Sequence, residues 1–408
     1  MAGRWSGLLR SGFGPPDFLR LAAASSFSGA GMSGEQVILG LLVYRITDSS
    51  AWVGTSLAAY YLPLFIAGTL AGAAADRFDR RILIRGLEIC HCVALAAVAG
   101  VIAAGLGGLA MMMAISVVLG SLRASTQPLR VSYVYDLFGR TAIVSALGRI
   151  NFAVRFGHLV GALAAGRITE AAGADAAFLV LAAGHAVAWL LVSRLKSAGQ
   201  ASVNPAERVP LRRNLAEYLN ELAVNRTLTM LVLLTAAVEL FGFSFQTGVP
   251  ELAADRLELG ADGLGDLNAA RAAGGVAASL MLSAGLGPLH RPGRLYIGVI
   301  LVFGLGMILL GSADSFPWAL AALFLVSAMA TASDVLTQSM VQMSVPNALR
   351  GRAMGAWSLA IGISPLGHIE MGLLIGSLGL AGAYAVNGSV LILLSVGVAL
   401  GLPALRRL

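Results

Sequence analysis

Residues 72–81 read Gly-Ala-Ala-Ala-Asp-Arg-Phe-Asp-Arg-Arg and lie where one long apolar run, 51–75, gives way to the next, 80–104. Each run is longer than the roughly 20 residues that a helix needs to cross a hydrocarbon core of ~30 Å. The charges of this stretch are therefore expected in a short loop at a membrane face, and Gly72 permits close helix packing there. Working outward, the same alternation of apolar runs and short charged loops recurs along almost the whole chain.

The composition predicts an integral membrane protein. Of the 408 residues, 57% are hydrophobic and only 12% are charged, with a mean hydropathy of +0.81. A soluble chain carries about 25% charged residues, so too few charges exist here to cover a water-facing surface. Because backbone polar groups in lipid must be satisfied within their own segment, we predict an all-α fold. The twelve predicted spans are 18–44, 51–75, 80–104, 107–136, 141–167, 174–195, 226–250, 262–288, 293–313, 316–345, 350–377 and 380–403.

The positive charges indicate the orientation of the chain. Twenty of the 28 Lys and Arg residues fall in the loops or at the adjoining span ends on the side of the N-terminus, three lie on the opposite side, and five fall deeper inside spans. Cytoplasmic loops carry this excess, which predicts a multi-pass protein of a bacterial inner membrane with both termini in the cytoplasm. The net charge of +7 is thereby explained without a nucleic-acid partner.

An internal repeat predicts two similar halves. Thr126-Gln127 reappears as Thr337-Gln338 after 211 residues, and Phe156-Gly157-His158-Leu159 resembles Leu366-Gly367-His368-Ile369 after 210. Such repeats are typical of folds with a central binding site. The predicted parts are a six-helix half at 1–195, a cytoplasmic linker with a short amphipathic helix at 196–225, and a second six-helix half at 226–408.

The loop after the second span can act as a conformational latch. Asp76 can pair with a helix N-terminus or with an arginine of a neighbouring helix, in a contact that opens and closes. The alternative is a basic loop that only sets the topology. The pattern resembles the G-x-x-x-D-R-x-G-R-R/K signature of the major facilitator superfamily, with Asp79 in place of the usual glycine. The residues that match are Gly72, Asp76, Arg77, Arg80 and Arg81.

The resemblance covers most of the chain and implies a function. It implies secondary active transport by alternating access, commonly driven by proton exchange. Within the superfamily, stretches such as Val154-Arg155-Phe156-Gly157 and His290-Arg291-Pro292-Gly293 resemble the enterobactin-exporter and macrolide-efflux-like members. This resemblance implies export of a small hydrophobic or siderophore-like compound.

A glycine series in the fifth span resembles the signature of the antiporter, or export, branch of that superfamily. Ala162 stands where the signature has proline, and Ala165 where it has glycine. Glycines at this spacing also make a smooth face for tight helix packing, so a purely structural role stays open. The glycines are Gly148, Gly157, Gly161 and Gly166.

Acidic residues inside the spans are candidates for proton coupling. Glu35, Glu239 and Asp334 fall in the first, seventh and tenth spans, which line the central cavity in the family that the chain resembles. A carboxylate in a poorly hydrated cavity can take up and release a proton near neutral pH. Glu35 is the first choice, whereas Asp334 could be a fixed arginine partner and Glu239 a substrate contact. Glu88 is interpreted as a local ion pair with Arg85.

Further polar residues in the spans predict the substrate cavity. Together they suit an anionic or polar, oxygen-rich substrate, although the arginines could instead neutralise the acids in interhelical pairs. His158 and His368 occupy equivalent repeat positions and could relay protons or form interhelical hydrogen bonds. The cavity residues are Gln36, Arg123, Gln127, Asn151, Arg155, Arg271, Gln338 and Gln342.

Other classes of protein are disfavoured. The chain has no HExxH, GxSxG or nucleotide-binding motif, so neither an intramembrane enzyme nor direct ATP use is expected. Its two cysteines, Cys90 and Cys92, predict no disulfide framework, and we expect no metal or cofactor. The alternatives are an uptake permease for a polar or anionic solute and, less favoured, a sensor or scaffold. The predicted partners are the bilayer, a small-molecule substrate and protons, with a monomer implied by the resemblance.

Overall fold

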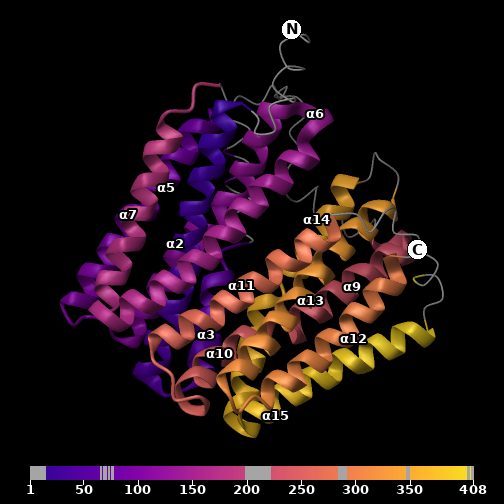
Figure 1. Cartoon of the computed structure of the whole chain (residues 1–408). Helices are drawn as coiled ribbons and strands as arrows, with labels where there is room; N and C mark the ends of the chain where they lie inside the picture. The colour runs from indigo at the N-terminus through magenta and orange to yellow at the C-terminus, as the bar shows by residue number, and fades with distance from the viewer. Residues whose placement is uncertain are drawn as a thin grey trace. The chain divides into compact units, whose positions relative to one another are not determined.

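A computed structural model describes residues 15–64, 67, 71, 74, 78–197, 222–283, 292–345, 350–401 and 405. Contacts between Cα atoms divide the chain into two compact units. Unit 1 comprises Met1–Leu39 and Pro63–Val203, and unit 2 comprises Gly40–Leu62 and Asn204–Leu408. The regular elements of the described residues are all helical (Figure 1). The predicted all-α fold class is confirmed.

The helices follow the predicted spans closely. The elements are α2 (Pro16–Thr47), α3 (Ser50–Tyr61), α5 (Arg80–Ala103), α6 (Leu109–Ala172), α7 (Ala174–Ser193), α9 (Arg226–Phe241), η3 (Phe243–Gly248), α10 (Val249–Glu251), η4 (Leu252–Arg256), α11 (Ala261–Ser283), α12 (Pro292–Gly311), α13 (Phe316–Met343), α14 (Arg350–Ile361) and α15 (Ser364–Gly401). Within the described residues, seven helical segments are long and apolar enough to cross a membrane. They are Arg80–Ala103, Leu109–Phe138, Ala174–Ser193, Arg226–Arg256, Pro292–Gly311, Phe316–Met343 and Gly355–Gly401.

Several elements differ from the predicted boundaries. The predicted span 226–250 is divided into α9, η3 and α10, and the predicted span 350–377 is interrupted between α14 and α15. The fourth and fifth predicted spans continue into each other as α6, a helix of 64 residues with Pro128 inside it. The last segment, α15, runs through the predicted gap after residue 377, but Gly379 breaks its helical geometry there with φ 71°. Gly173 ends α6 with φ 93°. Because glycine lacks a Cβ atom, both positions adopt the left-handed region without the strain that other residues would carry.

Unit 1 packs α2, α5, α6 and α7 around one apolar cluster. Phe18 of α2 meets Phe138 of α6 edge to face, with ring centroids 4.9 Å apart. The guanidinium of Arg149 lies over both rings, 5.0 Å from the centroid of Phe18 and 5.8 Å from that of Phe138. Tyr133 of α6 is fully buried in the same cluster. Its hydroxyl donates a hydrogen bond to the carbonyl of Ser197, which ties α6 to the segment after α7.

The glycine series brings α2 and the second part of α6 into backbone contact. A Cβ atom on Gly157 would lie 2.0 Å from the carbonyl oxygen of Ser26, and one on Gly161 would lie 2.1 Å from that of Ala30. Such a distance leaves no space for a side chain. Gly148, in contrast, has no atom within 4 Å of its Cβ position. Two glycines of the series thus allow a close helix crossing.

Unit 2 contains an equivalent glycine contact between two helices, at the positions that the internal repeat relates. A Cβ atom on Gly367 of α15 would lie 2.3 Å from the carbonyl oxygen of Leu240 in α9. Gly367 follows Gly157 by 210 residues, and Leu240 follows Ser26 by 214. In the same unit, Gly304 of α12 and Gly388 of α15 face each other, with each Cβ position about 2.5 Å from the other's carbonyl oxygen. The internal repeat is therefore visible in helix packing as well as in sequence.

The end of α2 and the whole of α3 cluster with unit 2. The hydroxyl of Tyr44 donates to the carboxylate of Asp255 at 2.5 Å, and that of Ser50 donates to Glu251 at 2.5 Å. A Cβ atom on Gly54 would lie 2.1 Å from the carbonyl oxygen of His368. The contact between α3 and α15 therefore relies on a glycine, as the contact between α2 and α6 does.

The glycine contacts predict unequal effects of the same substitution. We expect Gly161→Ala to lower the free energy of unfolding by about 1–3 kcal/mol, because the methyl group overlaps the Ala30 backbone. Gly148→Ala is the matched control and should be neutral or stabilising by up to ~1 kcal/mol, because alanine favours helix. Thermal unfolding of the detergent-purified protein, followed by size-exclusion chromatography, measures both. Equal melting temperatures for the two variants would contradict the packing role of Gly161.

Asp17 secures the segment after α7 to the start of α2. Its carboxylate accepts hydrogen bonds from the backbone N–H and hydroxyl of Ser197, both at 2.7 Å, and from the backbone N–H of Lys196. It also accepts one from Arg20 at 2.8 Å. Burial by itself raises the pKa of Asp17, but these donors outweigh it, and the net pKa is lowered from 3.8.

We expect Asp17→Asn to destabilise unit 1 by about 2 kcal/mol, the usual worth of hydrogen bonds to a charged group. A carboxylate with a lowered pKa stabilises the fold fully above its unfolded pKa and loses this effect as the pH falls through the folded value. The difference in melting temperature from the wild type should therefore be equal at pH 6 and pH 8 and shrink only below about pH 4. A difference that grows on acidification would contradict this assignment.

Candidate functional site

Glu35 lies in α2, and its side chain is fully buried in the structure. The preceding Gly34 packs on Leu181 of α7, where a Cβ atom would come within 2.7 Å of the leucine side chain. The following Gln36 is half-buried. Glu35 is thus an ionisable group enclosed among helices, which is the placement that a proton carrier requires. Its role stays a prediction.

Four polar residues of the predicted cavity share one helix, because the fourth and fifth spans continue as α6. Arg123 and Arg155 are half-buried, whereas Gln127 and Asn151 are exposed. The spacing of four residues within each pair places its members on the same helix face. The arginines therefore occupy the more enclosed positions along α6, and the two amides the more open ones.

In unit 2 the structure brings two of the predicted acids together. Glu239 of α9 is only 5% exposed, and Asp334 of α13 is half-buried. The two carboxylates interact electrostatically, and the hydroxyl of Ser364 donates a hydrogen bond to Glu239. The buried Tyr296 of α12 is within electrostatic range of both acids. Residues of four helices, α9, α12, α13 and α15, thus surround one acidic pair.

The remaining predicted cavity residues of unit 2 lie on α11 and α13. Arg271 donates a hydrogen bond from Nη1 to the side-chain oxygen of Gln246, a residue of η3 that the sequence did not single out. This bond orients the guanidinium. Gln338 and Gln342 are half-buried and, four residues apart, share one face of α13.

His368 is held by neighbours within unit 2. Its Nδ1 lies 3.0 Å from the hydroxyl of Thr247 in η3, and its ring stacks on Tyr61 of α3 with centroids 5.2 Å apart. These contacts support the interhelical hydrogen-bonding alternative for His368. The equivalent His158 is half-buried on α6.

The loop motif is described only at its C-terminal end, since Gly72, Asp76 and Arg77 lie outside the described residues. Arg80 forms an ion pair with Asp136 of α6 at 2.5 Å, and its guanidinium also donates to the carbonyl of Ser132. Asp79 caps α5 by accepting the backbone N–H of Arg81 at 2.9 Å and pairs with its guanidinium at 2.6 Å.

Asp79, which stands where the signature has glycine, therefore has a local structural role. An aspartate at the cap position satisfies a backbone donor that a glycine would leave to solvent. Arg81 in turn donates from Nη1 to the carbonyl of Lys196 at 2.8 Å. Asp79 thus fixes both the start of α5 and the direction of the arginine beside it.

Sequence reasoning missed a cluster of ionisable groups inside unit 1. The interpretation of Glu88 as an ion pair with Arg85 is wrong. Arg85 donates to the carbonyls of Val192, Ser193 and Leu195 at the end of α7. Glu88, only 4% exposed, instead lies 2.8 Å from Nδ1 of His185, a fully buried residue of α7.

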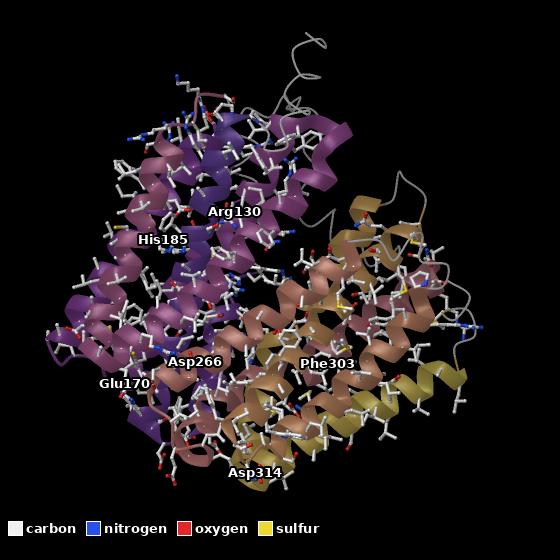
Figure 2. All side chains as sticks on the ribbon, in the orientation of Figure 1. Arg130, Glu170, His185, Asp266, Phe303 and Asp314 are labelled. Atoms are coloured by element: carbon white, nitrogen blue, oxygen red, sulfur yellow. The ribbon has the colours of Figure 1, made fainter. Side chains whose placement is uncertain are left out.

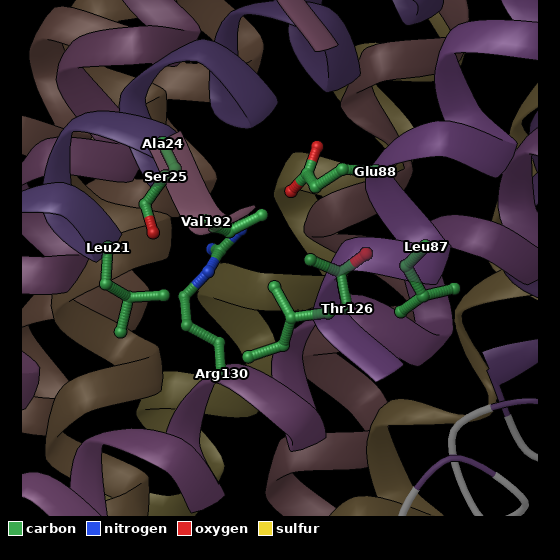
Figure 3. A pocket seen from close by; sticks show the side chains of 9 residues that line it. Leu21, Ala24, Ser25, Leu87, Glu88, Thr126, Arg130 and Val192 are labelled. Carbon is green, nitrogen blue, oxygen red and sulfur yellow. The ribbon is translucent and has the colours of Figure 1, made fainter. Parts of the chain in front are cut away.

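This cluster borders a small pocket in unit 1. Figure 3 shows Arg130 of α6 and Glu88 of α5 on the two sides of the pocket, with Ser25 and Thr126 beside them. Arg130 is 8% exposed and interacts electrostatically with Glu88. Figure 2 labels Arg130 and His185 on their helices within the unit. The only hint in the sequence was a histidine alone in an otherwise apolar sixth span, with Glu88 and His91 in the third.

A metal site finds no support in the part of the chain that the structure describes. No group of three or more His, Cys, Asp or Glu side chains there is arranged to hold a metal ion. Cys90 and Cys92 are both free thiols.

Comparisons with known proteins show which family has this architecture. The sequence pattern of the Major Facilitator Superfamily matches residues 21–366. No curated protein matches the chain. Among solved structures, a variant of the nucleoside transporter NupG superposes with a TM-score of 0.76 at 13% identity, covering 93% of this chain and 98% of that one. A POT family transporter in complex with 5-aminolevulinic acid gives a TM-score of 0.74 at 14% identity, covering 96% and 97%. At such identities the likeness shows the fold alone.

Proposed function

Because the chain belongs to the Major Facilitator Superfamily, we propose that it is a proton-coupled exporter of a small hydrophobic or siderophore-like compound, working by alternating access. The family makes it a transporter of the secondary kind rather than an enzyme. The observation that carries proton coupling is the acidic pair in unit 2, formed by the buried Glu239 and the half-buried Asp334.

Two interacting carboxylates, one of them buried, favour sharing a proton. If both were ionised, their charges would repel each other in a medium that screens them poorly. The pair is therefore expected to hold one proton and to titrate as a unit. Loss of that proton changes the charge inside α9 and α13, and a packed two-state element can respond to such a change. Ser364 fixes one of the two partners by its hydrogen bond to Glu239.

Glu35 is proposed as a second proton carrier, in unit 1. Its side chain is fully buried in α2, and an ionised carboxylate there needs a compensating partner. Uptake of a proton removes this requirement. A carboxylate of this kind can therefore alternate between two environments during a transport cycle.

Export is supported by the glycine series of α6. The series resembles the antiporter branch, and Gly157 and Gly161 lie against the α2 backbone. The alternative, uptake of a polar or anionic solute, is favoured by the half-buried arginines Arg123, Arg155 and Arg271, which can bind carboxylate or phosphate groups. The location in a bacterial inner membrane, the cytoplasmic termini and the monomeric state belong to the same proposal.

Proton flux in inverted membrane vesicles tests the coupling. With a pH-sensitive dye, siderophores, macrolides and cationic drugs are added in turn to vesicles that contain the wild type. We expect one class to evoke proton release, and Glu35→Gln, Glu239→Gln or Asp334→Asn to abolish it, because each removes an exchangeable proton. Asp314→Asn is the matched control, since this exposed acid lies between α12 and α13. Binding of a compound without any proton movement would exclude proton antiport.

The direction of transport has its own test. Cells that lack the protein should accumulate the compound identified in the vesicle assay if the protein exports it, since efflux is then lost. Radiolabelled compound retained by these cells is compared with that retained by cells complemented with wild type or with Asp334→Asn. A lower content in the deficient cells would instead establish uptake and contradict export.

A further inference from the structure

The cluster around Glu88 has no part in the proposal above, yet it gathers polar groups from four helices. Ser28 comes from α2, Glu88 and His91 from α5, Arg130 from α6 and His185 from α7. Except for Ser28, all of these are titratable groups, and each is at most 8% exposed. Buried charges in a membrane protein are expensive and need a reason.

Both oxygens of the Glu88 carboxylate are engaged. Oε1 accepts a hydrogen bond from the hydroxyl of Ser28 at 2.5 Å, and Oε2 lies 2.8 Å from Nδ1 of His185. One proton must lie between Oε2 and Nδ1, because a bare carboxylate and a bare imidazole nitrogen would repel each other. The pair therefore holds either one proton or two, and the second proton adds a hydrogen to the ring at Nε2.

The surroundings of His185 allow its Nε2 to gain or lose a proton. Its Nε2 is buried and has no hydrogen-bond partner among the described residues. Gly31 of α2 provides the space for the ring, because a Cβ atom there would lie 2.2 Å from Nε2. No neighbour in the described part of unit 1 thus fixes Nε2 in either protonation state.

His91 limits the cluster to one charged ring. It stacks on His185 with centroids 4.6 Å apart and an angle of 3° between the ring planes. Its Nδ1 donates to the carbonyl of Leu87 at 3.1 Å, which fixes the neutral tautomer with the hydrogen on Nδ1. Two stacked imidazolium rings would repel each other at this distance. A second proton is therefore expected on the Glu88–His185 pair and not on His91.

Arg130 compensates the charge when that proton leaves. With two protons the Glu88–His185 pair is neutral, and with one proton it carries a single negative charge. Arg130 lies across the pocket from Glu88 and interacts with it electrostatically (Figure 3). The proton and the guanidinium therefore compete for the same carboxylate.

We propose that Glu88 and His185 form a proton-binding site inside unit 1, with Arg130 as the cation that replaces the proton. The site binds its proton whether or not the chain is an exporter. That the proton takes part in the transport cycle rests on the proposed function.

Nitrogen NMR of the full chain in nanodiscs tests the site directly. The histidine rings are labelled with ¹⁵N, and His185→Gln assigns the Nε2 signal of His185 among the five histidines. In the wild type we expect this signal to change from the unprotonated to the protonated type when the sample is acidified. A signal that keeps one form throughout the acidification series would overturn the proposal.

Two variants should change the protonation of Nε2 of His185 in opposite directions. Glu88→Gln removes the carboxylate, so Nε2 should stay unprotonated throughout, because a charged ring would face Arg130 without compensation. Arg130→Gln removes the competing cation, so Nε2 should stay protonated throughout. Ser121→Ala is the matched control and should titrate like the wild type, since the hydroxyl of Ser121 donates to the carbonyl of Val117 within α6 and not to the pair. Identical titration in Glu88→Gln and wild type would show that the carboxylate has no part in the site.

The vesicle assay separates this inference from the proposed function. If the wild type releases protons with substrate, Glu88→Gln should lower that release, and full activity of this variant would overturn a role of the site in the cycle. If the wild type releases none, the proposed function fails, whereas the NMR titration still decides whether the site binds a proton.

Discussion

The direct contact of helix backbones at glycine is the constraint on which the rest of the structure depends. Helices in lipid gain little from hydrophobic burial against one another, so their association relies on close packing and on interhelical hydrogen bonds. At Gly157 and Gly161 the carbonyls of α2 occupy the space where side chains would stand. Gly367 makes the same contact with α9 in unit 2. These crossings fix which side chains face each other further along the same helices.

Close packing has a consequence for polar groups. Where helices leave no room for water, each buried charge must be satisfied by a protein neighbour or remain unfavourable. Glu88 meets this condition with Ser28, His185 and Arg130, whereas Glu239 has Ser364 and a second carboxylate. The first arrangement compensates a negative charge, and the second concentrates two of them. Both are sensitive to a single proton, because that proton decides whether the local charges balance.

Much of the fold could be predicted from the sequence, and much of the chemistry could not. Long apolar runs between charged loops indicate helices, and the breaks at Gly173 and Gly379 fall in predicted gaps. The continuation of α6 through residues 137–140 was missed, because a glycine followed by an arginine at 139–140 indicates a loop whether or not the helix goes on. The Glu88–His185 contact was missed for another reason. Because α7 is apolar nearly all round, no periodicity shows which of its faces meets Glu88 of α5.

The two units share their glycine contacts between helices but not the positions of their buried ionisable residues. At the offset of 214 residues that relates Ser26 to Leu240, Glu239 corresponds to Ser25. At the offset of 211 that relates the Thr-Gln pairs, Asp334 corresponds to Arg123. The stretches that correspond to Glu88 and His185, 299–301 and 396–398, hold only apolar residues and glycine. Glycines that repeat preserve the helix crossings, whereas the ionisable residues differ between the units. A proton bound in unit 1 therefore acts on a different set of charges from a proton bound in unit 2, and neither site is a copy of the other.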